Sequence, residues 1–187
     1  MRPLNELLRK VKFKLFTSEY MRVAYLHPRS VVLVTVRHAN AENVLPLDWH
    51  IPLSFFPKLY GISLESGNYS SELIAKSGVF AVNFMPAEFE HEILTAGRTS
   101  GRHADKFALT NLSRAEGKAL PVSVLNDAVG VLECTVVQTV ETGDHTLFVG
   151  KVVREQFNRH AHREQLFHVT RPGSTAGLQK PDGKGER

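Results

Sequence analysis

The stretch Ser30-Val31-Val32-Leu33-Val34-Thr35-Val36 indicates the fold class of this 187-residue chain. It follows Pro28 and consists almost entirely of β-branched and other apolar residues, which favour the extended conformation. Seven residues of this composition are typical of a strand and short for a helix. The stretch therefore predicts a buried strand.

Working outward, four more segments have the composition of strands: 59–64, 80–84, 128–141 and 146–155. Ser66-Gly67-Asn68 and Thr142-Gly143-Asp144 carry turn residues, and the second of these turns predicts a hairpin between the last two strands. Two segments are predicted to be helical: Ser70–Ser77, capped by Ser70 or Ser71 and ended by Gly78, and Ala87–Ala96, ended by Gly97. Many strands with few helices and no regular βαβ alternation predict a mainly β, antiparallel barrel rather than a doubly wound fold.

The composition predicts one soluble domain with short appendages, since 42% of the residues are hydrophobic and 22% are charged. Leu4, Leu7, Leu8, Val11 and Leu15 share one helical face beside basic residues, so residues 1–20 are expected to form an amphipathic helical extension. This helix could bind a membrane surface, although packing on the barrel or on a second subunit is favoured. The barrel domain is expected over 21–170, and a flexible tail over 171–187.

The net charge of +4 resides at the ends of the chain. Residues 1–16 carry five basic and one acidic side chain and residues 151–187 carry eight and four, leaving ten basic and fourteen acidic residues in the body. An acidic body argues against a nucleic-acid surface. The single cysteine, Cys134, excludes an internal disulfide and is consistent with a cytoplasmic protein, and no apolar stretch is long enough to span a membrane.

Familiar nucleotide and metal motifs are absent from the sequence. Neither G-x-G-x-x-G nor G-x-x-x-x-G-K-[ST] occurs, so a nucleotide would have to be held in another way. His160 and His162 lie close together, with His168 further along, but no third ligand stands at a diagnostic spacing from them, and no metal site is expected.

From about Leu26 to Val153, the chain resembles the flavin reductase-like family, of the flavoredoxin type, in the order of several segments. These are Pro28 to Thr35, Asn43 to Ser54, Gly61 to Leu64, Tyr69 to Ile74, Ser77 to Asn83, Thr99-Ser100-Gly101-Arg102-His103-Ala104-Asp105-Lys106-Phe107, and Gly143-Asp144-His145 with Phe148 to Val152. The Ser100 to Phe107 segment is similar to the family's S-G-R-x-x-D-K-F loop, and the last is similar to its G-D-H hairpin. The departures are Asp48, where the family commonly has a small polar residue, and Lys58, which stands in what is often a Pro-Pro pair.

The resemblance implies an antiparallel Greek-key split β-barrel that binds FMN and forms a homodimer with each flavin near the subunit interface. It also implies hydride transfer from NADH or NADPH to the flavin, and the alternative is a flavoredoxin-type electron carrier that exchanges electrons with a redox partner protein. The residues it assigns to FMN are Leu45, Pro46, Leu47, Asp48, Trp49, Ser63, Leu64, Ser70, Ser71, Asn83, Ser100, Gly101, Arg102 and Lys106. His145 is a candidate nicotinamide contact, with a plain hairpin-turn role as its alternative.

These residue types suit the parts of FMN. Lys106 and Arg102 can offset phosphate charge while Ser100 and the Gly101 backbone offer donors, although Arg102, Asp105 and Lys106 could instead form a solvated loop ion pair. Trp49 could cover the flavin ring or fill the core. If Asp48 points inward, its carboxylate should lower the flavin's reduction potential by disfavouring the anionic reduced form.

Overall fold

The computed structural model describes residues 28–157, 167–169 and 177–179. The helical extension expected over 1–20 lies outside these ranges, as do His160 and His162. Within the described ranges, no helix combines the length and the apolar character that crossing a bilayer requires.

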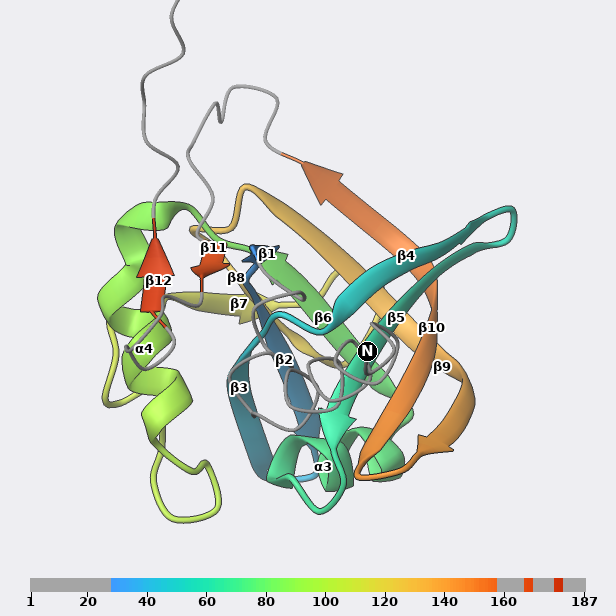
Figure 1. The fold of residues 1–187 in the computed structure, drawn as a ribbon, viewed down its shortest axis with the longest axis horizontal. Helices are drawn as coiled ribbons and strands as arrows, with labels where there is room; N and C mark the ends of the chain where they lie inside the picture. Colours follow the sequence, from blue (N-terminus) through green and yellow to red (C-terminus); the bar gives the residue numbers. More distant parts are fainter. Residues whose placement is uncertain (1–27, 158–166, 170–176, 180–187) are drawn as a thin grey trace, which may run out of the picture.

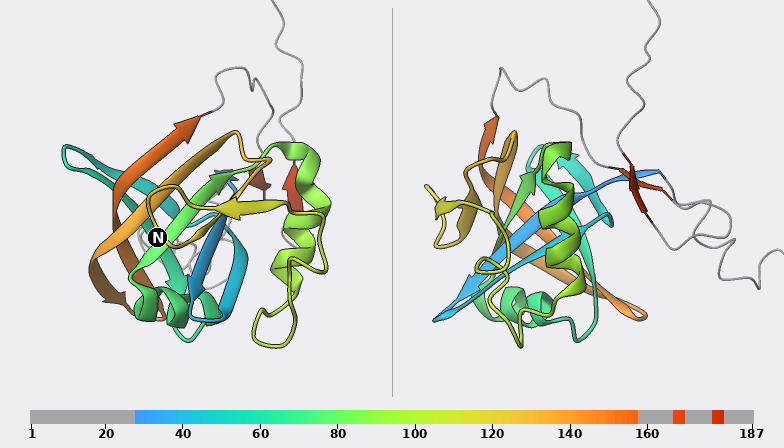
Figure 2. Two further views of the ribbon diagram at one scale, coloured as in Figure 1. Left: turned by 180° about the vertical axis from the view of Figure 1, so that it is seen from behind. Right: turned by 90° about the vertical axis from the view of Figure 1, so that its left-hand side faces the viewer.

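A strongly curved sheet of seven antiparallel strands forms the body of the protein (Figures 1 and 2). Its order is β3-β2-β6-β9-β10-β5-β4. The strands are β2 (Val32–His38), β3 (Ala41–Leu47), β4 (His50–Phe55), β5 (Lys58–Glu65), β6 (Val79–Phe84), β9 (Gly130–Thr142) and β10 (His145–Phe157). β3 and β4 are the two outer strands and are not hydrogen-bonded to each other, so the barrel stays open between them.

Smaller elements surround this sheet. β1 (Arg29–Ser30) pairs with β11 (Phe167–Val169), which pairs with β12 (Gly177–Gln179), and β7 (Arg114–Glu116) pairs with β8 (Ser123–Leu125). The helices are α3 (Tyr69–Ser77), which lies across one end of the barrel in Figure 1, and α4 (Glu90–Arg98), which follows the 3-10 turn η1 (Ala87–Phe89) and stands beside the sheet. β12 falls inside the segment 171–187 that was expected to be a tail.

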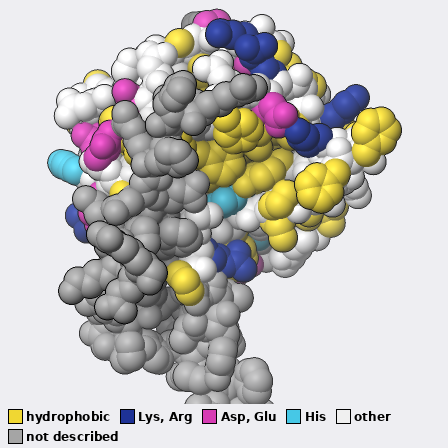
Figure 3. Space-filling view, turned by 90° about the horizontal axis from the view of Figure 1, so that it is seen from above, with side chains coloured by type: hydrophobic (Ala, Val, Ile, Leu, Met, Phe, Trp, Pro, Cys, Tyr) yellow, Lys and Arg dark blue, Asp and Glu magenta, His cyan; other side chains and the backbone are white. Residues whose placement is uncertain are grey.

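The β4–β5 hairpin extends beyond the rest of the sheet in Figure 1. Its tip carries Phe55 and Phe56, whose side chains are 91% and 98% exposed. Seen from above in Figure 3, apolar side chains project on the right-hand side, where Figure 1 shows this hairpin. The hairpin is therefore an apolar projection from an otherwise compact sheet.

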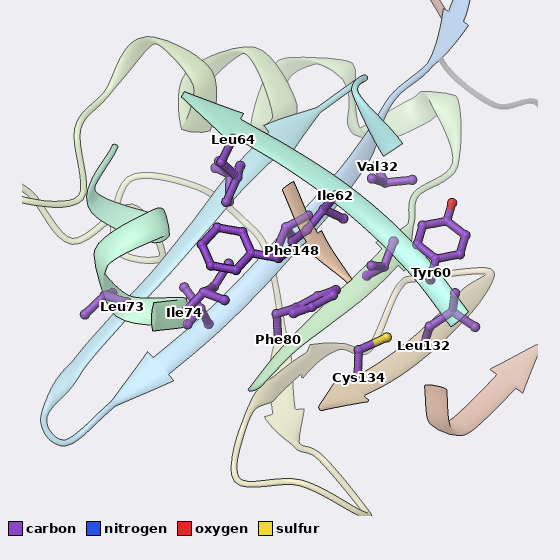
Figure 4. Packing of buried hydrophobic residues seen from close by; sticks show 14 residues of the cluster. Val32, Tyr60, Ile62, Leu64, Leu73, Ile74, Phe80, Leu132, Cys134 and Phe148 are labelled. Atoms are coloured by element: carbon purple, nitrogen blue, oxygen red, sulfur yellow. The ribbon is translucent and has the colours of Figure 1, made fainter. Parts of the chain in front are cut away.

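β2 is buried from Val32 to Val36, and all of these residues except Thr35 are apolar, because both faces of this part of the strand are covered. Val32, Val34 and Val36 point into the barrel, where they join the cluster around Phe80 and Phe148 that fills its centre (Figure 4). Val31, just before β2, and Leu33 face the other way and pack in the cluster that includes Ile93 of α4. Alternate side chains of a strand point to opposite faces, so a strand covered on both sides needs a continuous apolar run.

The expected mainly antiparallel sheet with few short helices is confirmed. The predicted 128–141 and 146–155 hairpin forms as β9 and β10, joined by a two-residue turn at Gly143 (φ 76°) and Asp144. Gly78 ends α3 in the left-handed conformation as expected, with φ 69°.

Two helix boundaries differ from the prediction. Asn68, rather than Ser70 or Ser71, caps α3, because its side chain accepts a hydrogen bond from the Ser70 N–H. The second helix continues through Gly97 to Arg98 instead of ending at Ala96.

Candidate functional site

Two hollows flank the carboxyl end of β3, and Leu47 is the one chain position between them. The first, called here the basic hollow, has a volume of about 430 Å³ and is lined by Asn43, Leu45, Pro46, Gly67, Asn68, Tyr69, Ala96, Gly97, Arg98, Thr99, Ser100, Gly101, Arg102 and Lys106. The second, called the tryptophan hollow, has a volume of about 560 Å³ and is lined by Arg29, Ser30, Asp48, Trp49, His50, Ile51, Gly61, Ser63 and Leu147. A ligand lying along this part of the chain could therefore contact both.

Lys106 is a buried cation in the basic hollow, with 6% of its surface exposed. Its Nζ donates a hydrogen bond of 2.8 Å to the Val44 carbonyl oxygen, and no ion pair with a carboxylate is found for it among the described residues. Burial lowers the pKa of Lys106 from 10.5 to about 8. An ammonium group with spare donors and no counter-charge suits an anion.

Asn43 also lines the basic hollow, and its side-chain amide oxygen is buried. Its Nδ2 donates to Ser70 Oγ at 2.7 Å, whereas its Oδ1 has no hydrogen-bond partner among the described residues. A Cβ added to Gly101 would lie 2.1 Å from that oxygen, so the loop can approach Asn43 only with glycine at this position. Buried polar atoms are nearly always paired, and an unpaired one in a hollow is consistent with a ligand site.

Arg102 stands at the rim of the basic hollow. Its guanidinium pairs with the Glu72 carboxylate and lies 5.0 Å from the centre of the Tyr69 ring. Asp105 instead accepts hydrogen bonds from the backbone N–H groups of Phe107 and Ala108, at 2.9 and 3.3 Å. The Arg102, Asp105 and Lys106 side chains thus have separate partners rather than forming one ion-paired group within the loop.

In the tryptophan hollow, Trp49 stacks on His145, with ring centroids 4.5 Å apart and planes at 20°. The Trp49 carbonyl accepts a 2.9 Å hydrogen bond from Ser63 N–H, which ties the β3–β4 connection to β5. Asp144 lies 2.7 Å from His145 Nδ1, and this hydrogen bond lowers the pKa of Asp144. The stack brings the β9–β10 turn against the segment that the resemblance assigns to the flavin ring.

His50 closes one side of the tryptophan hollow. Its Nε2 lies 3.0 Å from the Ser30 carbonyl oxygen, which can only accept, so Nε2 carries the proton. Nδ1 then accepts from the Tyr60 hydroxyl at 2.7 Å. Burial lowers the pKa of His50 and raises that of Tyr60 to about 12, so both side chains are neutral at pH 7. This network joins β4 and β5 to β1.

The structure brings most of the predicted site residues to these two hollows. Leu45, Pro46, Ser100, Gly101, Arg102 and Lys106 line the basic hollow, Asp48, Trp49 and Ser63 line the tryptophan hollow, and Ser70 reaches the first through Asn43. Leu47 lies between the hollows, and His145 meets the second through Trp49. Ser71 is buried within α3 and lines neither.

Asn83 and Leu64 are placed elsewhere. Asn83 uses its amide inside the protein: Nδ2 donates to Leu33 O and Thr35 Oγ1, both at 3.0 Å, and Oδ1 accepts from Leu125 N–H at 2.9 Å. The Leu64 side chain belongs to the central apolar cluster. The structure does not bring either side chain to a hollow.

The sequence did not single out Asn43, Arg98, Arg29 or His50 as individual site residues, although Asn43 and His50 lie in the segment that resembles the family's flavin-lining segment. Asn43 is the first residue of a segment that resembles the family, and a polar side chain directly before an apolar stretch could have indicated a ligand contact. Arg29, Ser30 and His50 come together because the end of β1 lies beside the start of β4, where the Ser30 carbonyl oxygen meets His50 Nε2, and no local pattern predicts this contact. Within the described ranges, no group of His, Cys, Asp and Glu side chains is arranged to hold a metal ion.

The fold and the two hollows define an open antiparallel β-barrel with a basic site beside an aromatic one. A family model described as the flavin reductase like domain matches residues 24–175, and the chain belongs to this flavin reductase-like family. The predicted split-barrel fold is thereby confirmed, since solved structures of the same fold include flavoredoxin from Methanosarcina acetivorans. That structure has a TM-score of 0.75 and 22% sequence identity, and the match covers 86% of this chain and 88% of that one.

Two curated relatives have similar sequences. An uncharacterised protein of Archaeoglobus fulgidus is 37% identical over 129 residues, which cover 69% of this chain and 72% of the relative. An NADH-dependent FMN reductase of Streptomyces nodosus subsp. asukaensis is 31% identical over 138 residues, covering 72% of each chain.

Proposed function

We propose that this protein is an FMN-binding oxidoreductase of the flavin reductase type, which takes hydride from NADH or NADPH. The observation that carries the proposal is the basic hollow, where Lys106 is buried with no carboxylate partner and Asn43 Oδ1 is buried with no donor among the residues that the structure describes. The donor set fits a phosphate ester with neighbouring hydroxyl groups, because the ammonium group needs an anion and the amide oxygen needs a hydroxyl.

In this proposal, Lys106, Arg102, Ser100 and the Gly101 backbone hold the phosphate, and Asn43 accepts from a ribityl hydroxyl. The backbone of Leu45 to Trp49 and the Ser63 side of β5 hold the ring. Bound FMN would supply a hydride acceptor, which no side chain can replace. The protein's contribution is to position the reactants and to exclude water. No acid–base residue is required for this step.

His145 is proposed to position the nicotinamide. It is fixed from one side by Asp144 and from the other by the Trp49 ring, at the edge of the tryptophan hollow. The similarity to an NADH-dependent FMN reductase supports a nicotinamide donor. We expect His145→Ala to raise the KM for NADH while leaving the Kd for FMN unchanged.

Equilibrium dialysis of the flavin-free protein against FMN tests the cofactor. We expect Lys106→Met to weaken FMN binding about 10- to 100-fold, because a charge-assisted hydrogen bond contributes about 1.5–3 kcal/mol. Lys76→Met, which removes an exposed lysine from the last turn of α3, is the matched control and should bind normally. Equal FMN binding by wild type and Lys106→Met would remove the basic hollow from the site.

Adding NADH or NADPH to the FMN-loaded protein without oxygen tests the donor. Loss of the oxidised-flavin absorbance within seconds is the expected result. The second candidate is an electron carrier without nicotinamide activity, favoured by the fold shared with flavoredoxin. Persistent colour with both nucleotides, followed by bleaching with dithionite, would establish the carrier instead.

The proposal also includes a homodimer, a cytoplasmic location and, for the carrier, a redox partner protein. The homodimer and the redox partner follow from the family resemblance, whereas the single cysteine favours a reducing compartment.

A further inference from the structure

We propose that Arg114 is a positioning residue that holds Lys106 and Asn43 at a fixed spacing in the basic hollow. Arg114 does not line this hollow itself. It contacts instead the residue next to each of the two side chains. The inference rests on the proposed function for its effect on FMN, and it concerns a residue outside the segments that resemble the family.

The guanidinium group of Arg114 joins two segments of the chain. Arg114, the first residue of β7, places its Nε 3.0 Å from Oε2 of Glu42 and its Cζ 4.2 Å from the centre of the Phe107 ring. Glu42 directly precedes Asn43, and Phe107 directly follows Lys106. These contacts, from Arg114 to Glu42 and to Phe107, are called here the Arg114 bridge. The bridge therefore ties together the two backbone positions next to the buried amide oxygen and the buried ammonium group.

The bridge lies where the sheet leaves the edge of a strand free. β3 is an outer strand and is hydrogen-bonded within the seven-stranded sheet to β2 alone. Residues 99–107 contain no strand, so side chains, rather than a ladder of the sheet, join this loop to β3. One such contact is the 2.8 Å hydrogen bond from Lys106 Nζ to the Val44 carbonyl oxygen, and the Arg114 bridge is a second. The spacing between Asn43 and Lys106 therefore depends on both contacts.

Both partners of Arg114 are themselves held in place. The other carboxylate oxygen of Glu42, Oε1, accepts a hydrogen bond from the Ser123 hydroxyl of β8, and β8 pairs with β7. Phe107 is buried in the apolar cluster that includes Ile93 of α4. The bridge thus links groups that are already ordered, which reduces the entropy cost that weakens many ion pairs on a surface.

The geometry of the bridge requires an arginine. A guanidinium group is planar, so its face can lie over an aromatic ring while its edge meets a carboxylate. A lysine ammonium group keeps the charge but has no such face, so Arg114→Lys should lose the bridge. Arg37 provides the matched control, because it pairs with Glu116 of the same strand β7 and lies over no aromatic ring among the described residues.

The state of Lys106 in the flavin-free protein should report on the bridge. Burial lowers the pKa of Lys106 to about 8, and this burial depends on the loop staying against β3. Without the bridge, the loop can move away and water can reach Nζ. The other basic side chains that line the hollow, Arg98 and Arg102, are unchanged in the variants below.

NMR titration of the ε-methylene signal of Lys106, assigned by its loss in Lys106→Met, measures this pKa in the full-length, flavin-free protein. We expect Arg114→Lys and Arg114→Met each to raise the pKa of Lys106 from about 8 toward 10.5, and Arg37→Lys to leave it at about 8. An unchanged pKa in both Arg114 variants overturns the proposal. A rise in Arg114→Met alone would assign the effect to the lost charge and would also overturn the bridge.

A double-mutant cycle on the Kd for FMN tests whether Arg114 acts through Lys106. We expect Arg114→Lys to weaken FMN binding about 3- to 10-fold, because the bridge consists of one cation–π contact and one partly exposed ion pair. In a Lys106→Met background the same substitution should cost much less, since the ammonium group that it positions is gone. Arg37→Lys should bind FMN normally. A full loss retained in the Lys106→Met background would show that Arg114 acts independently of Lys106 and would overturn the proposal.

The two measurements separate this inference from the proposed function. A wild type that binds no FMN would refute the proposed function, whereas the pKa of Lys106 in the flavin-free variants would still decide whether the bridge exists. Thermal unfolding of each variant shows that it is folded, and Arg114→Lys, which keeps the charge on β7, supplies a folded variant if Arg114→Met is unstable.

Discussion

Lys106 is expected to make FMN binding depend on pH. In the flavin-free protein its pKa is lowered to about 8, and a bound phosphate should raise it again. Above pH 8, FMN binding is then accompanied by the uptake of a proton by Lys106. We expect the Kd for FMN to be nearly constant between pH 7 and 8 and to rise up to tenfold per pH unit above 8. Fluorescence titrations from pH 7 to 10 measure this, and Lys106→Met should abolish most of the dependence.

Gly101 and Asn43 can be tested as a pair. Gly101→Ala should weaken FMN binding, because the added methyl group would meet Asn43 Oδ1. In an Asn43→Ala background the same change should cost much less, since the amide that it meets is gone. A double-mutant cycle on the Kd for FMN measures the coupling, and two additive losses would show that the two residues act separately.

Asp48 is expected to tune the flavin. It lines the tryptophan hollow, which is the site proposed for the ring. Removing this negative charge in Asp48→Ser should raise the midpoint potential by roughly 20–40 mV, because the anionic reduced flavin is then repelled less. A spectroelectrochemical titration checks this against Asp127→Ser, an exposed aspartate that lines neither hollow. An unchanged midpoint would remove Asp48 from the ring site.

At the scale of elements, one buried carboxylate holds the loop between β7 and β8. Glu133 of β9 accepts hydrogen bonds from the backbone N–H groups of Lys118, Ala119 and Leu120, at 3.1, 2.8 and 2.8 Å. Glu133→Gln replaces one acceptor with a donor that faces those N–H groups. We expect a loss of about 2–3 kcal/mol in the free energy of unfolding, measured by urea titration. Glu141→Gln, on the exposed part of the same strand, should change it little.

β2, β5, β6, β9 and β10 were predictable because their apolar residues follow the strand pattern. The turn residues Gly143 and Asp144 also predicted the β9–β10 hairpin. β3 and β4 were not predicted as strands, because Pro46 interrupts the first and Pro52 interrupts the second, which has no fully buried residue. The cap of α3 was misassigned because three cap-forming residues, Asn68, Ser70 and Ser71, lie within four positions. In the structure Asn68 accepts from the Ser70 N–H, while the Ser70 hydroxyl accepts from Asn43 Nδ2.

For the whole molecule, the resemblance located the site better than the residue types did. Lys106 and Gly101, which lie in one contiguous loop, line the same hollow in the structure. The same resemblance assigned Asn83 to FMN. In the structure its amide hydrogen-bonds to β2 and β8 instead, and these partners depend on the order of the strands in the sheet. Equally, sequence alone could not show that Arg29 and His50 share a hollow, because β1 reaches β4 only in the assembled barrel.

The missing hydrogen bonds between β3 and β4 have a consequence for exchange of the ligand. Both proposed binding sites lie along this open seam, at the carboxyl end of β3 and the start of β4. At this point only Asp48 and Trp49 join the two strands, and a small movement of this connection would widen the passage without breaking any ladder of the sheet. Loading and release can thus proceed in the fully folded protein, at a rate governed by local breathing rather than by its global stability.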